Sequence, residues 1–376
     1  MNRPRALAAL LLGAVAAAGS SPAAISAARE TPLRIVAVGD LHGDHERFLA
    51  VLRDAGVVDG KGRWIGGRTR LVQVGDRVDR GPDSRRIMDF LMGLEKPARR
   101  AGGAVHPLVG NHEAMNVFGD LRYVTAEEFA AFRTPESSAL RDALFASLRE
   151  VRRVAGEPPL TEAERTRWEA EHPPGWVEHR RAHSPDGRYG RWLAGQDAVL
   201  KLGDTLFLHG GLSPKYADFS LDDLNDRIRR ELKEGDPRLA VVSSDPEGPL
   251  WFRGLARGDP ALVPTLDAVL ARHGCRRMVV GHTVTEGLVM PLYGGRLVAI
   301  DVGLAAVYGG PPAALVIEGD RALALHRGRL LPLPEGGGEP LLAYVRAVAA
   351  LEPDRGKLDA LAGRLAAGLS AVPAKR

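Results

Sequence analysis

The chain has 376 residues, of which 45% are hydrophobic and 26% are charged. This balance excludes a disordered or collagen-like chain and allows a globular protein with a sizeable core. The formal net charge of +4 is small, and the arginines of 161–192 alternate with acidic residues, so the charge pattern does not indicate a nucleic-acid partner. Cys275 is the only cysteine, which excludes an intramolecular disulfide and a thiolate-rich zinc site.

The first 28 residues have the order of segments that is typical of a secretory signal peptide. Arg3 and Arg5 precede the apolar stretch ALAALLLGAVAAAG, and small residues follow it. A permanent membrane anchor is the alternative, but a spanning helix needs about 20 apolar residues. Small residues ending at Ala23 and at Ala28 leave two cleavage positions open. We therefore expect a signal peptide over 1–28 and a periplasmic or secreted protein without a stable membrane span.

Six apolar runs predict strands that are buried on both faces. Each run is a short series rich in Val, Leu and Ile that ends near a glycine. The runs occupy 33–40, 70–76, 103–111, 205–211, 277–283 and 296–303. Helical patterns at 44–56 and 84–103 separate the first three runs, and Asp44 is suited to the N-cap of the first helix. Strands that alternate with helices predict an α/β fold in which helices cover a mixed sheet.

Two segments depart from this alternation of strands and helices. From about 117 to 195 the apolar runs are replaced by helical charge patterns with breaks at GEPP and HPPGW. We expect a helical insertion over 117–195 that stands on the loop face of the sheet, and an insertion far from any site is the open alternative. After PEGGGEP at 334–340, residues 340–376 predict a tail of two amphipathic helices packed against the body.

Acidic, amide and imidazole side chains follow the apolar runs. In an open α/β sheet, the loops at the carboxyl ends of the strands gather in one crevice. The residues expected to meet there are Asp40, His42, Asp76, Asn111, His112, His209 and His282. Each one alone is explained as a turn former or a structural histidine, but the ordered set favours a site for divalent Mn, Fe or Zn. A bridging carboxylate would hold two such ions about 3.5–4 Å apart.

Six motifs of the chain, in their order, resemble those of the phosphoprotein phosphatase superfamily of metallophosphoesterases. They are GDLHG (39–43), GDRVDRG (75–81), GNHE (110–113), HGGLSP (209–214), FRG (252–254) and GHTVTEG (281–287). The last motif, followed by IDVG at 300–303, is most similar to the bacterial Shewanella-like branch. The resemblance covers 33–330 without most of the insertion. It implies a metallophosphoesterase catalytic domain built as a mixed β-sheet sandwich flanked by helices.

The resemblance also implies which residues hold metal. By this resemblance the ligands are Asp40 and His42 for the first ion, Asp76 for both ions, and Asn111, His209 and His282 for the second. Two Mn ions, or Fe or Zn in their place, would make a shared water acidic enough to act as a bridging hydroxide nucleophile. Asp44 and His45 lie at the start of a helix and are not expected to be ligands. The histidines expected to be surface or structural residues are His106, His172, His179, His183, His273 and His326.

Other residues of the motifs would handle the substrate. His112 would protonate the leaving oxygen as general acid, and Asp79 would orient its imidazole and raise its pKa. Arg80 and Arg253, together with Asn111, would bind the phosphoryl oxygens, because planar bidentate donors suit that group better than a lysine. The chain departs from the eukaryotic Ser/Thr members, whose Ser-Ala-Pro-Asn-Tyr stretch is replaced here by IDVGLAAVYGG.

We therefore expect an exported, metal-dependent phosphomonoesterase that acts on a phosphoprotein or phosphopeptide. Because that stretch is absent and the Shewanella-like branch includes tyrosine-selective members, phosphotyrosine and phosphoserine or phosphothreonine both stay open as substrates. Hydrolysis of small phosphoesters or dinucleoside polyphosphates is an alternative, since symmetrical diadenosine tetraphosphate hydrolases share these motifs. An inactive phosphate-binding module is a third interpretation, and the intact His112, Asp79 and pair of arginines argue against it.

Overall fold

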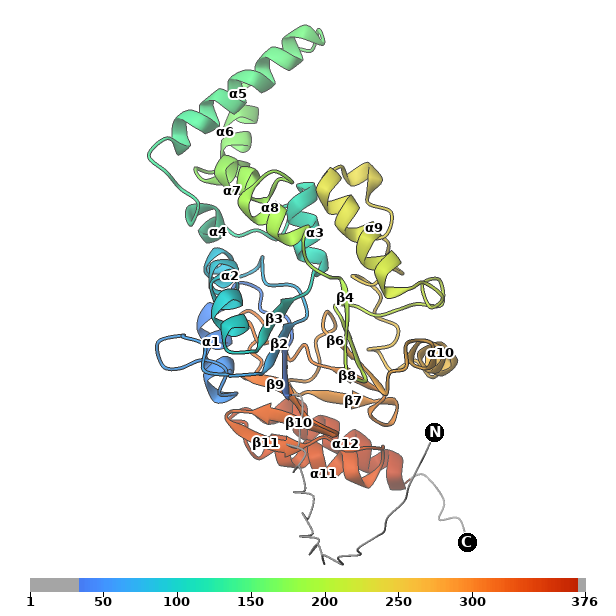
Figure 1. Cartoon of the computed structure of the whole chain (residues 1–376). Coiled ribbons are helices and arrows are strands. Elements are labelled where there is room, and N and C mark those ends of the chain that lie inside the picture. The colour runs from blue at the N-terminus through green and yellow to red at the C-terminus, as the bar shows by residue number, and fades with distance from the viewer. Residues whose placement is uncertain (1–33, 371–376) are drawn as a thin grey trace, which may run out of the picture. The chain divides into compact units, whose positions relative to one another are not determined.

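The computed structural model describes residues 34–370, whose strands form two mixed sheets (Figure 1). The signal peptide predicted at 1–28 lies outside the described residues, as do residues 371–376 at the end of the predicted tail. None of the helices in the described part of the chain is both long and apolar enough to cross a membrane.

The first sheet has six strands in the order β11-β10-β9-β1-β2-β3. They are β1 (Arg34–Val38), β2 (Arg70–Gln73), β3 (Ala104–Pro107), β9 (Ala313–Glu318), β10 (Arg321–His326) and β11 (Arg329–Pro332). β1, β2 and β3 are parallel, and β9, β10 and β11 are each antiparallel to their neighbours. The parallel strands are joined by α1 (His45–Asp54) and α2 (Ser84–Arg100), which lie beside this sheet (Figure 1).

The second sheet has five strands in the order β4-β5-β6-β8-β7. They are β4 (Val199–Leu202), β5 (Thr205–Leu208), β6 (Arg277–Val280), β7 (Met290–Leu292) and β8 (Leu297–Ala299). β5, β6 and β8 are parallel, whereas β4 and β7 are antiparallel edge strands. The helices between β5 and β6 are α9 (Leu221–Glu234) and α10 (Val263–His273), and short 3₁₀ turns occupy Pro237–Leu239, Pro260–Leu262 and Tyr293–Gly295.

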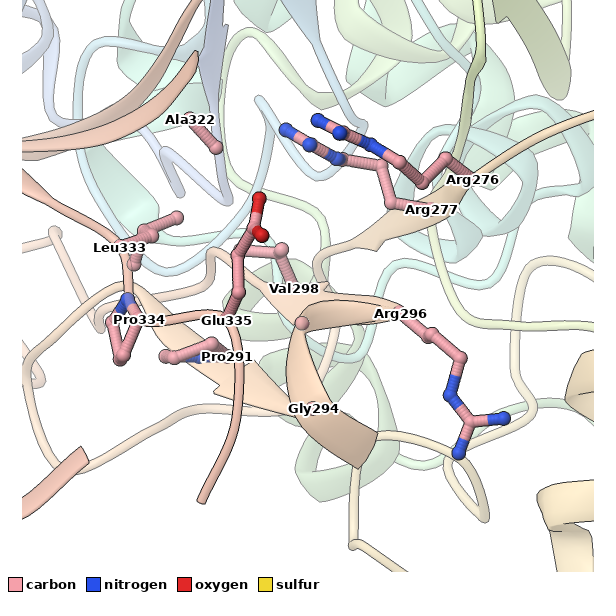
Figure 2. Close-up of a pocket in the computed structure, with 11 residues that line it drawn as sticks. Arg276, Arg277, Pro291, Gly294, Arg296, Val298, Ala322, Leu333, Pro334 and Glu335 are labelled. Carbon is pink, nitrogen blue, oxygen red and sulfur yellow. The ribbon is translucent and has the colours of Figure 1, made fainter. Parts of the chain in front are cut away.

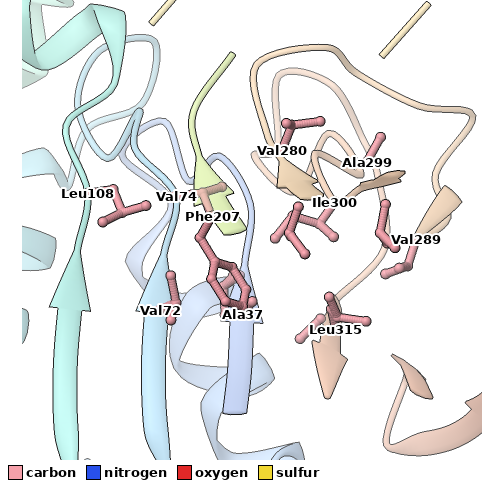
Figure 3. Close-up of a cluster of buried hydrophobic side chains, with 14 of the residues drawn as sticks. Ala37, Val72, Val74, Leu108, Phe207, Val280, Val289, Ala299, Ile300 and Leu315 are labelled. Carbon is pink, nitrogen blue, oxygen red and sulfur yellow. The ribbon is translucent and has the colours of Figure 1, made fainter. Parts of the chain in front are cut away.

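The core lies between the inner faces of the two sheets (Figure 3). Val72 and Leu315 from the first sheet and Phe207 and Val280 from the second belong to one cluster, and all four are fully buried. Burial of a side chain of this size contributes about 1.5–3 kcal/mol. Because both sheets bury one face in the same core, they form a sandwich, which confirms the predicted α/β architecture.

All six apolar runs form strands, but three belong to each sheet. The strands outside the runs are β4, β7, β9, β10 and β11. Edge strands need fewer apolar residues, because one side faces solvent; in β11 every residue is at least partly exposed. β9 has the apolar sequence AALVIE. It pairs with β1 in antiparallel orientation, although most of the chain separates the two strands in sequence.

Local sequence explains how the chain leaves β1. The Asp44 carboxylate accepts a hydrogen bond from the backbone N–H of Arg47 at 3.1 Å, which caps α1 as predicted. Its second oxygen accepts the N–H of Ala306 at 3.0 Å. The helix ends at Asp54, and Gly56 follows with a φ of 64°. Both oxygens of Asp44 are therefore used by the backbone.

Helices fill the segment from the end of β3 to β4. They are α3 (Asn111–Phe118), α4 (Ala126–Ala130), α5 (Ser137–Val154), α6 (Glu162–Glu171), α7 (Trp176–His183) and α8 (Arg188–Leu193). α7 contacts α3, α4 and α5, and α8 contacts α9. His179 and His183 are buried in α7 with ring centroids 4.1 Å apart, and Phe132 packs against both. These two histidines are structural.

The last two helices pack on the body of the protein. They are α11 (Glu339–Ala349) and α12 (Gly356–Ser370), and α11 contacts both β11 and α12. The face of α11 that contains Leu342, Val345 and Val348 is buried. Tyr344 is also buried, and its hydroxyl donates to the carbonyl oxygen of Val289 at 2.7 Å. The apolar face of α11 therefore belongs to the main core.

Candidate active site

The side chains that follow the apolar runs lie together. Asp40 and His42 follow β1, Asp76 follows β2, Asn111 and His112 begin α3, His209 follows β5, and His282 follows β6. Each of them is at most 4% exposed. The backbone N–H of His282 donates to the carboxylate of Asp40, 242 residues away, at 3.0 Å. The fold thus brings all seven predicted residues to one place.

Asp76 lies at the centre of this group. Its Oδ2 is 3.8 Å from Nε2 of His42 and 3.8 Å from Nε2 of His112. Its Oδ1 is 3.3 Å from Nε2 of His209. Two sets of donor atoms each lie within 4.8 Å of one another, and they are His42, Asp76 and His112, and Asp76, His209 and His282. Asp76 is common to both sets, as a carboxylate that bridges two cations must be.

Asp40 and Asn111 add oxygen donors around the same volume. Oδ1 of Asn111 lies 2.9 Å from Nε2 of His209. Oδ2 of Asp40 is 4.0 Å from Nε2 of His42, and its Oδ1 is 3.9 Å from Nδ1 of His209. The six predicted ligands therefore surround one small, buried volume.

The three predicted histidine ligands share a pattern of hydrogen bonds. In each ring one nitrogen lies 2.9–3.1 Å from a backbone carbonyl oxygen, which is that of Val78 for His42, Val74 for His209 and Trp251 for His282. Burial also lowers the pKa of His42 to about 3 and that of His282 to about 2. A neutral ring that donates one N–H to a carbonyl can offer its other nitrogen to a cation, which is the usual arrangement of a histidine ligand.

Three buried carboxyl groups lie close together at this site, and the repulsion between their negative charges is unfavourable without a cation. Asp301, which follows β8, is 2% exposed, and burial and the charge of Asp76 raise its pKa to about 6. Burial and the charges of Asp301 and Asp76 raise the pKa of Asp40 well above its usual range. A divalent cation would remove this repulsion, and carboxylate, amide and imidazole donors suit Mn, Fe or Zn. The residues present therefore fit two divalent metal ions.

Asp301 was not among the predicted site residues, although it has the same sequence signal. It lies near the end of the apolar run 296–303 in the stretch IDVG, as Asp40 and Asp76 end theirs. One of its oxygens accepts the N–H of Gly303 at 3.0 Å, and its carboxyl group is close enough to that of Asp40 to raise the pKa of Asp40. Asp301 therefore lies next to the donor set.

His112 differs from the other three histidines in its partner. Its Nδ1 lies 2.5 Å from Oδ2 of Asp79, and Oδ1 of Asp79 accepts a hydrogen bond from Asn116 at 2.9 Å. Burial opposes protonation of His112, but the charge of Asp76 and the hydrogen bond to Asp79 outweigh it and raise the pKa of His112. An imidazole held in this way can carry a proton near neutral pH and donate it from Nε2.

Two guanidinium groups border the donor set. Nη1 of Arg80 lies 3.3 Å from Nε2 of His42, and Nη2 lies 3.2 Å from Nε2 of His112. Arg253 donates from Nη1 to the backbone carbonyl oxygen of His282. Arg80 is therefore next to the predicted general acid, and Arg253 is next to the ligand from β6.

Backbone strain is concentrated at these residues. The residues with φ between 41° and 70° include His42, Asp76, Asp79, Arg80 and His282. Residues other than glycine rarely adopt this left-handed region, and strain of this kind is frequent at functional sites. A Cβ on Gly281 would collide with Oδ1 of Asp40, so the approach of this turn to the ligand requires glycine.

Glu128 of α4 is hydrogen-bonded to the backbone of Asp79. It is 2% exposed, and its Oε1 accepts the backbone N–H of Asp79 at 3.0 Å and the hydroxyl of Ser84. Its Oε2 accepts the N–H of Thr125 at 3.0 Å, and burial and the charge of Asp79 raise its pKa to about 7. Thr125 and Glu128 form a capping box, which is visible in the sequence, but the contact with Asp79 is not.

Tyr123 gives the 117–195 segment a second contact with the site. Its ring centroid lies 5.0 Å from the guanidinium carbon of Arg80 and 5.0 Å from the ring of His112. Its carbonyl oxygen accepts the backbone N–H of Arg80 at 3.0 Å. Tyr308, in the stretch IDVGLAAVYGG, lies 5.5 Å from the same guanidinium carbon. The start of the helical segment therefore lies at the site.

Comparison with known families agrees with this geometry. A family model described as calcineurin-like phosphoesterase matches residues 33–286. The chain belongs to the calcineurin-like phosphoesterase family. The matched residues include Asp40, Asp76, His112 and His282. This phosphoesterase is therefore an enzyme that hydrolyses phosphoesters, as the motifs predicted.

Its relatives confirm the resemblance to the Shewanella-like branch. The phosphoesterase is 30% identical to Shewanella-like protein phosphatase 2 of Arabidopsis thaliana, with 79% of this chain and 78% of the relative covered. It is 27% identical to Shewanella-like protein phosphatase 1 of Plasmodium berghei, with 66% and 61% covered. The crystal structure of the cold-active protein-tyrosine phosphatase of a psychrophilic Shewanella species is 26% identical, with a TM-score of 0.61 and 80% of each chain covered.

We expect Glu128→Ala to lower both the stability and the activity of the phosphoesterase. The variant leaves the N–H groups of Asp79 and Thr125 without their acceptor, which costs about 1–3 kcal/mol for a buried donor, and it frees the strained residue that holds His112. Denaturant unfolding and phosphate release measure the two effects. Glu127→Ala is the control, because Glu127 is exposed in the same turn of α4. If unfolding and kcat both stay at wild-type values, Asp79 does not depend on Glu128.

Proposed function

We propose that this phosphoesterase is an exported, metal-dependent phosphomonoesterase that removes phosphate from phosphoproteins or phosphopeptides. The observation that carries the proposal is the pairing of His112 with Asp79 beside Arg80, where His112 also lies within reach of His42 and Asp76. A binding module needs no proton donor aimed at the ligand, whereas a phosphomonoesterase needs one for the leaving oxygen. The relatives named protein phosphatase and protein-tyrosine phosphatase support a phosphoprotein substrate.

In this proposal the donor set holds two divalent ions. The ligands are Asp40, His42, Asp76, Asn111, His209 and His282. When bound, such ions supply an acidic water as nucleophile and neutralise charge on the phosphoryl group. Mn²⁺ is the first ion to test, with Fe or Zn as alternatives, because this donor set suits all of them. Arg80, Arg253 and Asn111 bind the phosphoryl oxygens.

His112 supplies the proton that the leaving alkoxide or phenoxide needs. Its Nδ1–H stays hydrogen-bonded to Asp79, so the transferred proton is the one on Nε2, which lies beside Arg80. Asp79 keeps the ring oriented and stabilises the imidazolium before the transfer. The leaving oxygen must therefore approach Nε2 of His112.

The aromatic surroundings of Arg80 favour phosphotyrosine. Tyr123 and Tyr308 both place their rings against its guanidinium group, at 5.0 Å and 5.5 Å. A phenyl ring whose phosphate reaches Arg80 comes within range of both aromatic groups, and contacts between aromatic rings contribute about 0.5–1.5 kcal/mol. We infer that phosphotyrosine peptides are hydrolysed faster than phosphothreonine peptides.

Phosphate release from these two kinds of peptide tests the proposal. After a chelator has removed metal, the mature chain is expected to be inactive, and Mn²⁺ is expected to restore its activity. Diadenosine tetraphosphate and sugar phosphates in the same assay test the alternative substrates. Binding of phosphate without turnover of any of these compounds would favour the inactive binding module. Fractionation of the source cells tests export, and a wholly cytoplasmic chain would contradict it.

A further inference from the structure

A pocket of about 150 Å³ lies at the other end of β6 from the active site (Figure 2). Arg277 begins β6 and lines this pocket, whereas His282 follows the carboxyl end of the same strand. Much of the wall is apolar, and its residues include Pro291, Val298, Ala322 and Leu333. No residue of the active site lines the pocket, so it is a separate feature.

Arg277 is a buried cation whose guanidinium group makes no hydrogen bond or ion pair with the described residues. It is 4% exposed, and its Nη1 is buried without a hydrogen bond. Burial lowers the pKa of Arg277, but a guanidinium group stays charged in proteins because its ordinary pKa is above 12. A buried charge without a hydrogen-bonding partner is unfavourable. The side chain is therefore suited to a ligand with a negative charge.

The two neighbouring arginines of the pocket are already engaged. Arg276 lies 3.5 Å from the carboxylate of Asp204. Arg296 forms an ion pair with Asp267, and Figure 2 shows its guanidinium group turned away from those of Arg276 and Arg277. Arg277 is thus the arginine of this pocket without an ion pair to a described residue, although the charges of Asp204, Glu335 and Asp320 act on it.

Glu335 is the acidic residue among those that line the pocket. It is exposed, and its carboxylate points toward the side of the pocket where Arg277 lies (Figure 2). The ion pairs of the described residues do not include one between Glu335 and Arg277, although its charge acts on the guanidinium group. Glu335 therefore does not occupy the position beside Arg277, and it would repel an anion bound there.

We propose that this pocket binds a small oxyanion, such as inorganic phosphate, through the guanidinium group of Arg277. The planar donors of arginine match the oxygen atoms of a tetrahedral anion, and charge-assisted hydrogen bonds are strong where water is scarce. A volume of about 150 Å³ is below the range of about 300–1,000 Å³ that larger ligands need, which excludes a nucleotide. The proposal does not rest on the proposed function, because the pocket and the active site share no residue.

Calorimetric titration of the metal-loaded full chain with inorganic phosphate tests this site. We expect the wild type to bind a phosphate in addition to any bound at the active site. Arg277→Gln is expected to weaken that additional binding at least roughly tenfold while phosphate inhibition of the active site stays unchanged. Arg296→Gln is the matched control and is expected to bind as the wild type does, because Arg296 is paired with Asp267 and its guanidinium group points away from that of Arg277 (Figure 2). Titrations with sulfate and acetate distinguish a tetrahedral oxyanion from a carboxylate.

Two outcomes would overturn the proposal. One is a wild-type chain that binds no phosphate outside the active site, and the other is an Arg277→Gln variant that keeps the additional phosphate. If circular dichroism shows that Arg277→Gln does not fold, the affinity of Glu335→Gln for the additional phosphate tests the proposal instead. Loss of the repelling carboxylate is expected to tighten the additional binding several-fold, and an unchanged affinity would mean that the pocket holds only water.

Discussion

Asp76→Asn is expected to lower kcat by about 10³-fold or more and to reduce the metal content of the protein. Among the described residues Asp76 is common to both donor sets, and it also accepts the backbone N–H of His112 at 3.0 Å. An amide lacks the charge that a bridging ligand needs, and a loss of several kcal/mol of transition-state stabilisation corresponds to a decrease of that size. Elemental analysis and phosphate release measure the two effects.

Asp218→Asn is the matched control for this substitution. The side chain of Asp218 is 98% exposed, so the same chemical change there should leave metal content and kcat unchanged. If Asp76→Asn instead retains both metal ions and wild-type turnover, Asp76 does not bridge them, and the assignment of the donor set fails.

His112→Asn is expected to lower kcat by about 10²–10⁴-fold, the usual range for a lost general acid. The decrease should be large for phosphothreonine peptides, because an alkoxide needs a proton to leave. It should be much smaller for p-nitrophenyl phosphate, because that leaving group is stable as an anion. Parallel assays of the two substrates measure the difference. An equal decrease for both would contradict the role of His112 as proton donor.

The same variant should also change the dependence of activity on pH. Asp76 and Asp79 raise the pKa of His112 against the effect of burial, so the protonated ring persists to a higher pH than that of a free histidine. Only this form can donate a proton, and wild-type activity should therefore fall as the pH rises through the raised pKa. His112→Asn should lack this decrease, whereas His273→Asn, on the partly exposed end of α10, should keep it.

Much of the site could be predicted because its signals are local. Asp40 and Asp76 each end an apolar run, after a glycine, and parallel strands bring such positions to one edge of a sheet. The cap at Asp44 depends on a residue three positions away, which is why the start of α1 was correctly predicted. Asp301 has the same signal as the first two aspartates, and only its contact with Asp40 shows that it belongs to the site.

Other features depend on contacts that no short stretch of sequence contains. Glu128 is recognisable as part of a capping box, but its hydrogen bond to Asp79 joins residues 49 positions apart. The orientation of the ligand histidines depends on carbonyl groups of other loops; for His209 the carbonyl is that of Val74, 135 residues away. Sequence patterns therefore identify the residue types of the site, but not the bonds that orient them.

The sequence by itself determined the six buried runs, the first helix cap and the polar residues that end the runs, because periodicity and turn chemistry act over a few residues. Only the tertiary structure decided that the runs divide between two sheets, that β9 pairs with β1, and that Nη1 of Arg277 is buried at its pocket without a hydrogen bond to a described residue. The physical reason is the same for each. Packing between segments that are distant in sequence determines which strands pair and which groups surround a buried charge. The free energy of that packing is not encoded in local propensity.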